Sequence, residues 1–554
     1  MTRITALILV AALVLVVRPA GGRPPTALAG PDRVLGATDP DARLHLSILL
    51  RLPGERRLAA VLARSADRFG PSRPLTAATF GACFGLTRAR IAVVVRELRN
   101  LGFDVLGSDK QRTAVEVDTS ATVAQKTFGV HFRDLADERG RRFHLPVGSV
   151  HIPARLATDV VGVAGLSNRP RARAYDVPAT GLRPADLVKA YGIVPLRQRR
   201  ILGQGQTIAV LSFDALRLTD LREFETATGT RGGVTRRVLV AGGATGAGPE
   251  AALDVETIRG IAPRATIENF EAPYDGPASF GRALERIVPR LRPGSILSVS
   301  NGVCDVRALE GGQQWLSRAD RLLGERQLEF AAARGINVFV SSGDAGAYDC
   351  QWHLITDLRL ATDWPGDSPW VVSVGGTRLW TRVDGAYHEE AGWEDVLSTM
   401  GSGGGLNPLD GRPHWQKGSG VQNEYSNGKR QLPDVAATAD PDSGYFVVFD
   451  GKAGRKGGTS GSAPFWAGVC ALVQQYAHRS GVPRLPFFPP LLYRIGTEQT
   501  ASSFHDVVRG GNRYYRATGG WDYVTGLGSP DAWNLARAVS KDIVRIRRSH
   551  ATRP

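Results

Sequence analysis

The chain has 554 residues, more than one hydrophobic core usually organises, so we expect several structural units rather than a single module. Its 42% hydrophobic and 22% charged residues, with a mean hydropathy of −0.14, exclude a polytopic membrane protein and wholesale disorder. The net charge of +16 by itself suggests a polyanionic partner such as nucleic acid. Four Cys without CxxC or Cys/His spacing exclude a disulfide-dense scaffold and a zinc motif.

The N-terminus has the three parts of a secretory signal. Arg3 precedes an apolar run over residues 4–17, and the small residues that follow allow cleavage after Ala20 or Ala29. The run is shorter than the roughly 20 residues of an ordinary membrane span. We therefore expect residues 1–29 to be a signal peptide, the protein to be secreted, and no stable membrane insertion after signal removal. An uncleaved anchor is the alternative.

The next segment, residues 30–167, mixes strand and helix patterns. Residues 44–50 and 113–118 have the composition or alternation of strands, and residues 88–101 have the period of an amphipathic helix. An Arg- and Pro-rich stretch over residues 168–181 follows. These patterns predict an α+β domain and then an exposed linker in which activation cleavage can occur.

Residues 182–540 alternate between patterns of buried strands and helices. Runs rich in β-branched residues, at 206–211 and 336–340, indicate strands buried on both faces. Helical stretches alternate with them, over residues 251–259, 316–334 and 464–477. The alternation predicts an α/β fold with a parallel sheet. We expect residues 541–554 to form a basic tail.

The sharpest chemical signal is the run GGTSGSAP over residues 457–464, followed at once by an apolar helix pattern. It places Ser460 at a helix N-terminus. There the helix dipole and free backbone N–H groups stabilise the oxyanion that forms when a hydroxyl attacks a carbonyl. An ordinary N-cap serine is the alternative interpretation. The run resembles the serine motif shared by subtilisins and sedolisins.

The general base distinguishes these two families. A subtilisin needs a His base, usually in a His-Gly-Thr-His context, and none of the ten His residues has that setting. Instead, Glu250 and Asp254 lie four residues apart on a predicted helix, with Pro249 suited to its first position. Two neighbouring carboxyls share a proton, so the ionised one can accept the Ser460 proton in acid. A solvated acidic helix face is the alternative.

A third element is Asp344, in the turn that follows the predicted strand at residues 336–340. The carboxyl end of a buried strand is where α/β folds present functional groups. A turn Asp that accepts hydrogen bonds from its own backbone is the alternative.

In this order, the motifs resemble those of the sedolisin family, the serine-carboxyl peptidases, in a pro-kumamolisin-like precursor. The resemblance implies a subtilisin-like parallel sheet with helices on both faces, preceded by an α+β inhibitory prodomain that acts in cis. It implies that Ser460 is the nucleophile, Glu250 the general base and Asp254 its partner. It also implies that a protonated Asp344 donates a hydrogen bond to the oxyanion, which requires burial or an acidic medium.

The C-terminal Gly-rich segment resembles the sedolisin calcium site. Calcium requires six or more oxygen ligands, which carboxylates and backbone carbonyls supply. The resemblance implies one Ca²⁺ ion, held by the side chains of Asp506 and Asp522 and the carbonyls of Val507, Thr518 and Gly520. Without the resemblance, a plain structured turn is the simpler interpretation.

The substrate-binding edge departs from the family pattern. Relatives typically carry an aromatic residue where this chain has Asn301, between Ser300 and Gly302, and all three are candidates for substrate binding. Asp363 is a candidate for the specificity pocket, with a surface loop as the alternative. Asp214 is a candidate member of the carboxylate network.

The four Cys divide into two pairs. Cys304 and Cys350 follow the substrate edge and the Asp344 turn, at the same end of the sheet, so we expect a disulfide between them outside the cell. Cys83 and Cys470 lie in different predicted domains, and we expect both to be free and buried.

These features predict a secreted, acid-acting serine-carboxyl endopeptidase, made as a self-processing zymogen, that cleaves proteins through an acyl-enzyme on Ser460. The alternatives are a tripeptidyl-peptidase of the same family, a neutral subtilisin-like protease, and an inactive extracellular binding protein on this scaffold. We expect protein or peptide substrates and a monomer.

The charge distribution argues against nucleic acid as a partner. Residues 1–180 carry +11 of the net charge and residues 181–554 only +5, so most of the excess lies on the part that processing removes. We expect a basic prodomain to complement an acidic catalytic cleft near neutrality and to loosen as carboxylates protonate.

Overall fold

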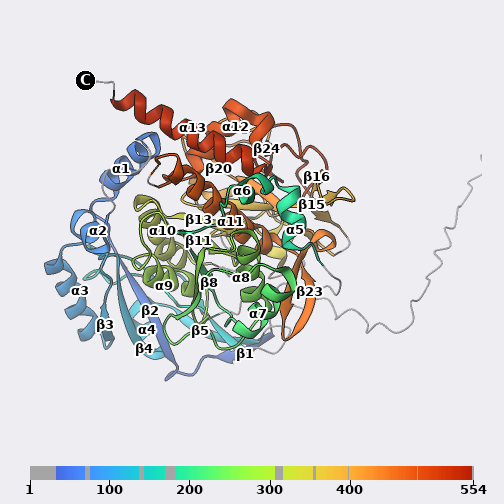
Figure 1. Cartoon of the computed structure of the whole chain (residues 1–554). Coiled ribbons are helices and arrows are strands. Elements are labelled where there is room, and N and C mark those ends of the chain that lie inside the picture. Colours follow the sequence, from blue (N-terminus) through green and yellow to red (C-terminus); the bar gives the residue numbers. More distant parts are fainter. Residues whose placement is uncertain are drawn as a thin grey trace, which may run out of the picture.

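The computed structural model describes residues 33–68, 75–136, 142–168, 181–305, 316–352, 357–396, 398–482 and 484–551. The predicted signal peptide and most of the predicted linker lie outside these residues. The described chain forms two units, and Figure 1 shows the N-terminal one, in blue and cyan, against one side of the C-terminal one.

The N-terminal domain is an α+β unit of two antiparallel sheets. Its strands are β1 (Arg33–Ala37), β2 (Arg43–Leu50), β3 (Asp104–Ser108), β4 (Ala114–Ser120), β5 (His131–Ala136), β6 (Arg142–Val147) and β7 (Val160–Ala164). Its helices are α1 (Glu55–Arg68), α2 (Ala77–Cys83), α3 (Arg88–Asn100) and α4 (Ala121–Phe128). One sheet has the order β3-β4-β2-β7 and the other β1-β5-β6. Strands β2 and β4 and helix α3 confirm the three elements expected in this region.

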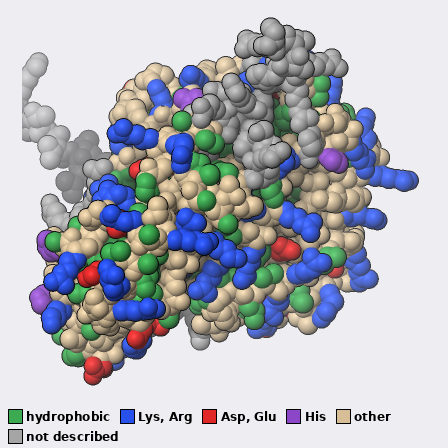
Figure 2. Space-filling model, turned by 90° about the vertical axis from the view of Figure 1, so that its left-hand side faces the viewer, with side chains coloured by type: hydrophobic (Ala, Val, Ile, Leu, Met, Phe, Trp, Pro, Cys, Tyr) green, Lys and Arg blue, Asp and Glu red, His purple; other side chains and the backbone are tan. Residues whose placement is uncertain are grey.

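Helix α3 shows how local sequence fixes this domain. It begins after Thr87, whose hydroxyl accepts the N–H of Arg90, and it buries Ile91, Val94 and Leu98 at helical spacing. Its Arg side chains remain on the exposed side. Figure 2 faces this side of the molecule and shows many Lys and Arg side chains but few Asp and Glu.

The C-terminal domain is built on one large sheet. Its strands are β8 (Thr207–Ser212), β9 (Thr235–Leu239), β10 (Thr266–Glu271), β11 (Ile296–Val299), β13 (Asn337–Ser341), β15 (Val372–Thr381), β16 (Tyr387–Gly392) and β21 (Val435–Thr438). They follow the order β9-β10-β8-β11-β13-β15-β16, with β21 also paired to β15. All pairs are parallel except β15 with β16.

Helices cover both faces of this sheet. They are α5 (Pro184–Ala190), α6 (Val194–Gln198), α7 (Leu218–Thr228), α8 (Pro249–Ile261), α9 (Ala278–Ile287), α10 (Arg318–Ala333), α11 (Thr459–Arg479), α12 (Pro489–Ser503) and α13 (Ala532–Ala551). In β8, Ile208 and Val210 enter the core that contains α8 and α11, whereas Ala209 and Leu211 enter the core that contains α9 and α10. The expected α/β fold, with an α+β domain before it, is confirmed.

Short strands build the loops around the sheet. They pair as β12 (Val303–Cys304) with β14 (Asp363–Trp364), β17 (Glu394–Asp395) with β18 (Met400–Gly401), β19 (Gly405–Gly411) with β20 (Lys429–Leu432), β22 (Tyr445–Phe449) with β23 (Lys452–Lys456), and β24 (Phe504–His505) with β25 (Ser529–Pro530). Two 3₁₀ turns cover Asp349–Trp352 and Pro441–Ser443. Among the described helices, none alone is long and apolar enough to cross a bilayer, and the pair α2 and α3, which together reach that length and composition, is bent by 93°.

The N-terminal domain packs on the face formed by α9 and α10. Leu49 and Ala164 share an apolar cluster with Ala278 and Leu323 across the boundary. The ring of Phe80 meets that of Phe330 edge to face, with centroids 4.8 Å apart. Each domain has its own core, and a continuous apolar contact joins the two.

The predicted boundary between the catalytic domain and a basic tail, after residue 540, is wrong. Helix α13 continues past residue 541, because Leu535, Val539 and Ile543 recur at helical spacing and enter the same core. Asp542 also pairs with Arg494 of α12 at 2.6 Å. The C-terminal domain therefore extends beyond the predicted boundary at residue 540.

Candidate active site

Ser460 lies in the first turn of α11, two residues after its N-cap, Gly458. The N-cap has φ = +105°, and a Cβ there would stand 2.6 Å from Asp344 Oδ2, so both the backbone and the close approach require glycine. The Ser460 hydroxyl donates to the carbonyl oxygen of Ser300 at 3.1 Å. Its side chain is thus held at a helix N-terminus, where backbone N–H groups point outward.

Ser300 links the serine helix to the carboxylate helix. It follows β11, and its hydroxyl oxygen lies 2.5 Å from Asp254 Oδ1 and 3.0 Å from the carbonyl oxygen of Ser460. Sequence reasoning proposed Ser300 only as a substrate contact. Only the fold shows that the residue after β11 lies between α8 and the first turn of α11.

Asp254 is fully buried on α8, one turn after Glu250. Burial raises its pKa well above the usual range, the charge of Glu250 raises it further, and the hydrogen bond from Ser300 opposes the shift. Its Oδ2 has no hydrogen-bond partner among the described residues. Every residue of α8 from Ala251 to Ile261 is buried, so the alternative of a solvated acidic face is wrong for Asp254, whereas Glu250 is half-buried.

Asp214 joins this carboxylate group from the loop after β8. It is buried, and its charge adds to the rise in the Asp254 pKa. A Cβ at Gly248, the N-cap of α8, would stand 2.0 Å from Asp214 Oδ2. The loop therefore packs directly against the start of the helix that carries Glu250.

Asp344 lies at the carboxyl end of β13, as predicted. Its Oδ1 accepts the backbone N–H of Thr459 at 2.6 Å and the Thr459 hydroxyl at 2.8 Å. Burial raises its pKa, and these two hydrogen bonds partly offset the rise. The Asp344 carboxyl accepts these hydrogen bonds from α11 rather than from its own turn, so it lies beside the residue that precedes Ser460.

The substrate edge brings Asp363 next to Gly302. Asp363 lies on β14, opposite Cys304 of β12, and is buried. A Cβ at Gly302 would stand 3.0 Å from its Oδ2. The alternative of a surface loop for Asp363 is therefore wrong, because strand pairing with β12 carries it inside. Asn301 and Gly302 are half-buried at the end of β11.

Sequence reasoning missed Asp349, a third carboxyl in this region. It is fully buried, and its Oδ1 accepts the N–H of Ala345 at 2.9 Å. Burial raises its pKa well above the usual range, and the charges of Asp363 and then Asp344 raise it further. The available signal was a second Asp in the Gly-rich turn, five residues after Asp344.

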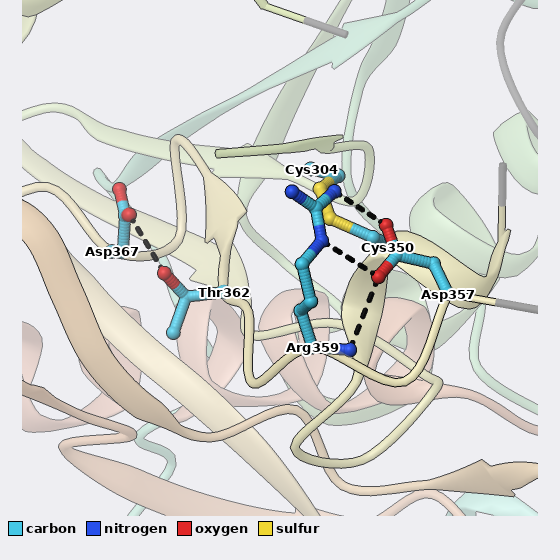
Figure 3. Close-up of a disulfide and its surroundings, with 6 residues drawn as sticks. All are labelled: Cys304, Cys350, Asp357, Arg359, Thr362 and Asp367. Carbon is cyan, nitrogen blue, oxygen red and sulfur yellow. Dashed lines mark hydrogen bonds and ion pairs between the residues drawn. A yellow bond between two sulfur atoms is a disulfide. The ribbon is translucent and has the colours of Figure 1, made fainter. Parts of the chain in front are cut away.

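A disulfide between Cys304 and Cys350 holds these loops together (Figure 3). It ties β12 of the substrate edge to the 3₁₀ turn after Asp344, and the pair formed by Asp357 and Arg359 lies beside it. Cys470 is free and buried as expected, but Cys83 is exposed. The expectation for Cys83 is wrong because α2 turns Ala77, Phe80 and Gly81 inward instead.

The predicted calcium ligands come together around one loop. Asp506 Oδ2 accepts the N–H of Gly520, and Asp522 Oδ2 accepts the N–H of Thr518, each at 3.0 Å. Burial raises the pKa of Asp522 to about 7, although several backbone N–H groups oppose the rise. The described residues contain no cluster of three or more His, Cys, Asp and Glu side chains suited to a metal. The donor set fits a hard cation only if carbonyls, including that of Val507, complete it.

Comparisons with known proteins cover both domains. Residues 33–169 match the family model of the pro-kumamolisin activation domain, and residues 238–494 match that of the subtilase family. Kumamolisin from Bacillus sp. (strain MN-32) is 29% identical over 91% of this chain and 93% of its own length. Tripeptidyl-peptidase 1 from Canis lupus familiaris is 30% identical over 55% of this chain and 54% of its own.

A solved structure agrees with this assignment. Pseudomonas sedolisin, a serine-carboxyl proteinase complexed with two molecules of pseudo-iodotyrostatin, superposes with a TM-score of 0.55 at 27% identity, covering 67% of this chain and 99% of its own. The chain therefore belongs to the sedolisin family of serine-carboxyl peptidases and carries a pro-kumamolisin activation domain at its N-terminus.

Proposed function

We propose that this protein is the precursor of a secreted, acid-acting endopeptidase in which Ser460 is the nucleophile, Glu250 the general base, Asp254 its partner and Asp344 the oxyanion donor. One observation carries the proposal. The Ser300 hydroxyl lies within hydrogen-bond distance of both Asp254 and the backbone of Ser460, and this shared contact supports a role for the Asp254 carboxyl at the serine. The family assignment adds that a peptidase of this class uses such a site.

The proposed reaction proceeds through an acyl-enzyme. The Ser460 oxygen attacks the peptide carbonyl carbon as its proton passes to Glu250, and the tetrahedral intermediate expels the amine, which takes that proton. Water then attacks the ester while Glu250 accepts and returns a proton. Asp254, protonated through burial, shares its proton with Glu250 and so stabilises the ionised base.

The pKa values favour operation in acid. Asp344 donates to an oxyanion only while it is protonated, and burial raises its pKa toward that state. A His base, as in a neutral subtilisin, would be charged and ineffective at the same pH. The absence of a His-Gly-Thr-His context among the ten His residues of the sequence supports the carboxylate mechanism over that alternative.

The remaining assignments complete the proposal. Ser300, Asn301, Gly302 and Asp363 would contact the substrate along the edge formed by β11, β12 and β14. One Ca²⁺ ion would supply positive charge to the buried Asp522 and to Asp506, with carbonyls of Val507, Thr518 and Gly520 completing its oxygen shell. The signal at residues 1–29 supports secretion, and a monomer stays a prediction.

Endopeptidase action is proposed here over tripeptidyl-peptidase action. The match to tripeptidyl-peptidase 1 covers only 55% of this chain. A peptide with an acetylated N-terminus separates the two, because a tripeptidyl-peptidase needs a free amine. Internal cleavage of such a peptide supports an endopeptidase, and strict dependence on a free N-terminus would overturn that part of the proposal.

The mechanism is tested on the purified precursor at about pH 4, near the pKa of free carboxyls. We expect the precursor mass to fall to that of a chain beginning near residue 182 and casein to be cleaved. The Ser460→Ala protein should do neither, whereas Ser462→Ala in the same turn should retain activity. Processing and proteolysis that persist in Ser460→Ala would overturn the nucleophile, and activity at pH 7 with none in acid would overturn the carboxylate mechanism.

A further inference from the structure

The activation domain has a groove of about 650 Å³ on the side formed by α3 and the β3–β4 turn. Five cationic side chains line it, namely Arg88, Arg96, Arg99, Lys110 and Arg112. None of the five forms an ion pair with a residue of the described chain. The groove therefore concentrates positive charge without a counter-charge from within the described protein.

The single carboxyl that lines the groove does not offset this charge. Asp109 is buried, and its carboxylate turns toward β4, where it accepts the N–H and the hydroxyl of Thr113 and the N–H of Ala114. Burial raises its pKa, so a part of its population is neutral in acid. Glu97, the acid on α3, does not line the groove.

These cations do not hold the catalytic domain. The described polar contacts across the boundary use other residues, such as Gln111 with Gln327 at 3.0 Å and Arg326 with the carbonyl of Thr113 at 2.8 Å. Figure 2 shows Lys and Arg side chains spread over the face on which the groove opens. The sequence led us to expect that the positive charge of this domain complements the catalytic cleft. The five cations of the groove do not have that role.

We propose that this groove binds an acidic, amphipathic peptide segment of another protein. Four of the five cations are Arg, whose planar guanidinium forms paired hydrogen bonds with carboxylates. Between them lie the apolar side chains of Ile91, Ala92 and Val95. A segment that alternates carboxylate and apolar side chains would match both the charged rim and the apolar floor.

The shape of the site favours a peptide over other polyanions. A flat anionic bilayer would touch the rim of a groove and leave its floor empty. A polyphosphate or sulfated polysaccharide would satisfy the cations but would make no apolar contact with the exposed Ala92 and the half-buried Val95. Among the residues that the structure describes, no acidic segment of this chain lines the groove apart from Asp109. The proposal concerns the activation domain and does not depend on the catalytic mechanism.

The test uses the full precursor carrying Ser460→Ala, with its intact mass verified, so that the activation domain stays attached. The probe is a fluorescein-labelled 12-residue peptide of alternating Glu and Leu, measured by fluorescence anisotropy at pH 7 and 50 mM salt. We expect saturable binding that weakens at least tenfold at 500 mM salt. We expect a loss of at least tenfold with Arg96→Gln/Arg99→Gln/Lys110→Gln. Peptides of alternating Glu and Ser should bind more weakly than the Glu/Leu peptide.

A matched control removes the same charge elsewhere on the domain. Lys126→Gln/Arg133→Gln/Arg43→Gln alters three exposed cations outside the groove and should keep the affinity within twofold. Circular dichroism and thermal midpoints check that both triple variants fold. Equal losses in the two variants, or no binding of the Glu/Leu peptide, would overturn the proposal. So would groove-dependent binding of heparin, polyphosphate or phosphatidylglycerol vesicles with none of the peptide.

Discussion

Two buried groups of carboxylates in the catalytic domain differ in how their charge is compensated. One surrounds Arg321 on α10, and the other contains Asp254 on α8. In both groups, burial raises the pKa of the acids. The difference between them separates a group that holds the structure together from one that is suited to catalysis.

Around Arg321, the carboxylates share a cation. Its guanidinium pairs with Asp305, with Asp367 at 2.9 Å, with Asp410 at 2.5 Å and with Glu325 at 3.3 Å. Burial alone would lower the Arg321 pKa, but these charges raise it well above its usual value. Burial, followed by the charge of Asp367, still raises the pKa of Asp305 to about 8, although the charge of Arg321 opposes the rise.

Around Asp254, the compensation is different. No cationic side chain of the described residues forms an ion pair with Asp254, and its Oδ2 has no described hydrogen-bond partner. The nearest charges that act on it are those of Glu250 and Asp214, which have the same sign. A proton is then the available counter-charge, and a proton can move.

Four predictions test this contrast between the two carboxylate groups, from the largest expected effect to the smallest.

The largest effect is expected for Glu250→Gln. An amide cannot accept the Ser460 proton, so kcat/KM on casein-derived peptides at pH 4 should fall about 10³-fold, within the usual range for a lost general base. Glu256→Gln is the matched control, since Glu256 is also buried on α8 but accepts the N–H of Val448 at 2.8 Å. The contrast fails if the two variants lose activity to a similar degree.

Arg321→Met should destabilise the protein rather than alter its chemistry. It leaves four acids around a buried position without their cation, and such a loss typically costs about 3–5 kcal/mol. Thermal unfolding at pH 7 measures the effect, which should shrink at pH 4 as the acids protonate. The exposed Arg222→Met should change stability by about 0.5 kcal/mol or less. An Arg321→Met protein as stable as the parent would show that the cation is not needed.

The proposed calcium site at Asp506 and Asp522 would offer a third form of compensation, by a metal ion. At a calcium concentration of about 100 times Kd, binding should add about 2.7 kcal/mol to stability, which EDTA should remove. Asp522→Asn should abolish the calcium-dependent shift in the thermal midpoint. Asp384→Asn, in an exposed turn, should retain it. A calcium-dependent shift in the thermal midpoint that survives in Asp522→Asn would show that calcium does not bind at this loop.

The smallest effect is expected for the stability of Asp254→Asn. Because the folded-state pKa of Asp254 is raised, the folded state binds more protons than the unfolded state, so this group lowers stability as pH rises above about 4. Asparagine carries no charge, so the variant should be more stable than the parent at pH 7 and equal to it at pH 3. Parallel stability curves for the two proteins would contradict a raised pKa.

The sequence predicted the elements that depend on local patterns. Apolar periodicity predicted β8, β13, α8, α10 and α11 close to their observed bounds, because a strand or helix buries its own repeating face. The motifs also indicated the candidate catalytic side chains, since Gly458 and Pro249 begin the helices that carry Ser460 and Glu250. The start of the basic tail and the burial of Cys83 were wrong because both depend on packing between distant segments.

By itself, then, the sequence determined the domain order, the α/β class and the family to which the chain belongs. Only the tertiary structure decided what surrounds each carboxyl. Asp254 and Asp367 are both buried acids, but Asp254 lies beside Ser300 and Asp367 lies beside Arg321. In each pair the two residues are 46 positions apart in the chain. Spacing along a chain does not specify such neighbours, because they arise from which strand ends and helix starts the sheet brings to the same edge. Desolvation and neighbouring charge, and hence the pKa, follow from that arrangement.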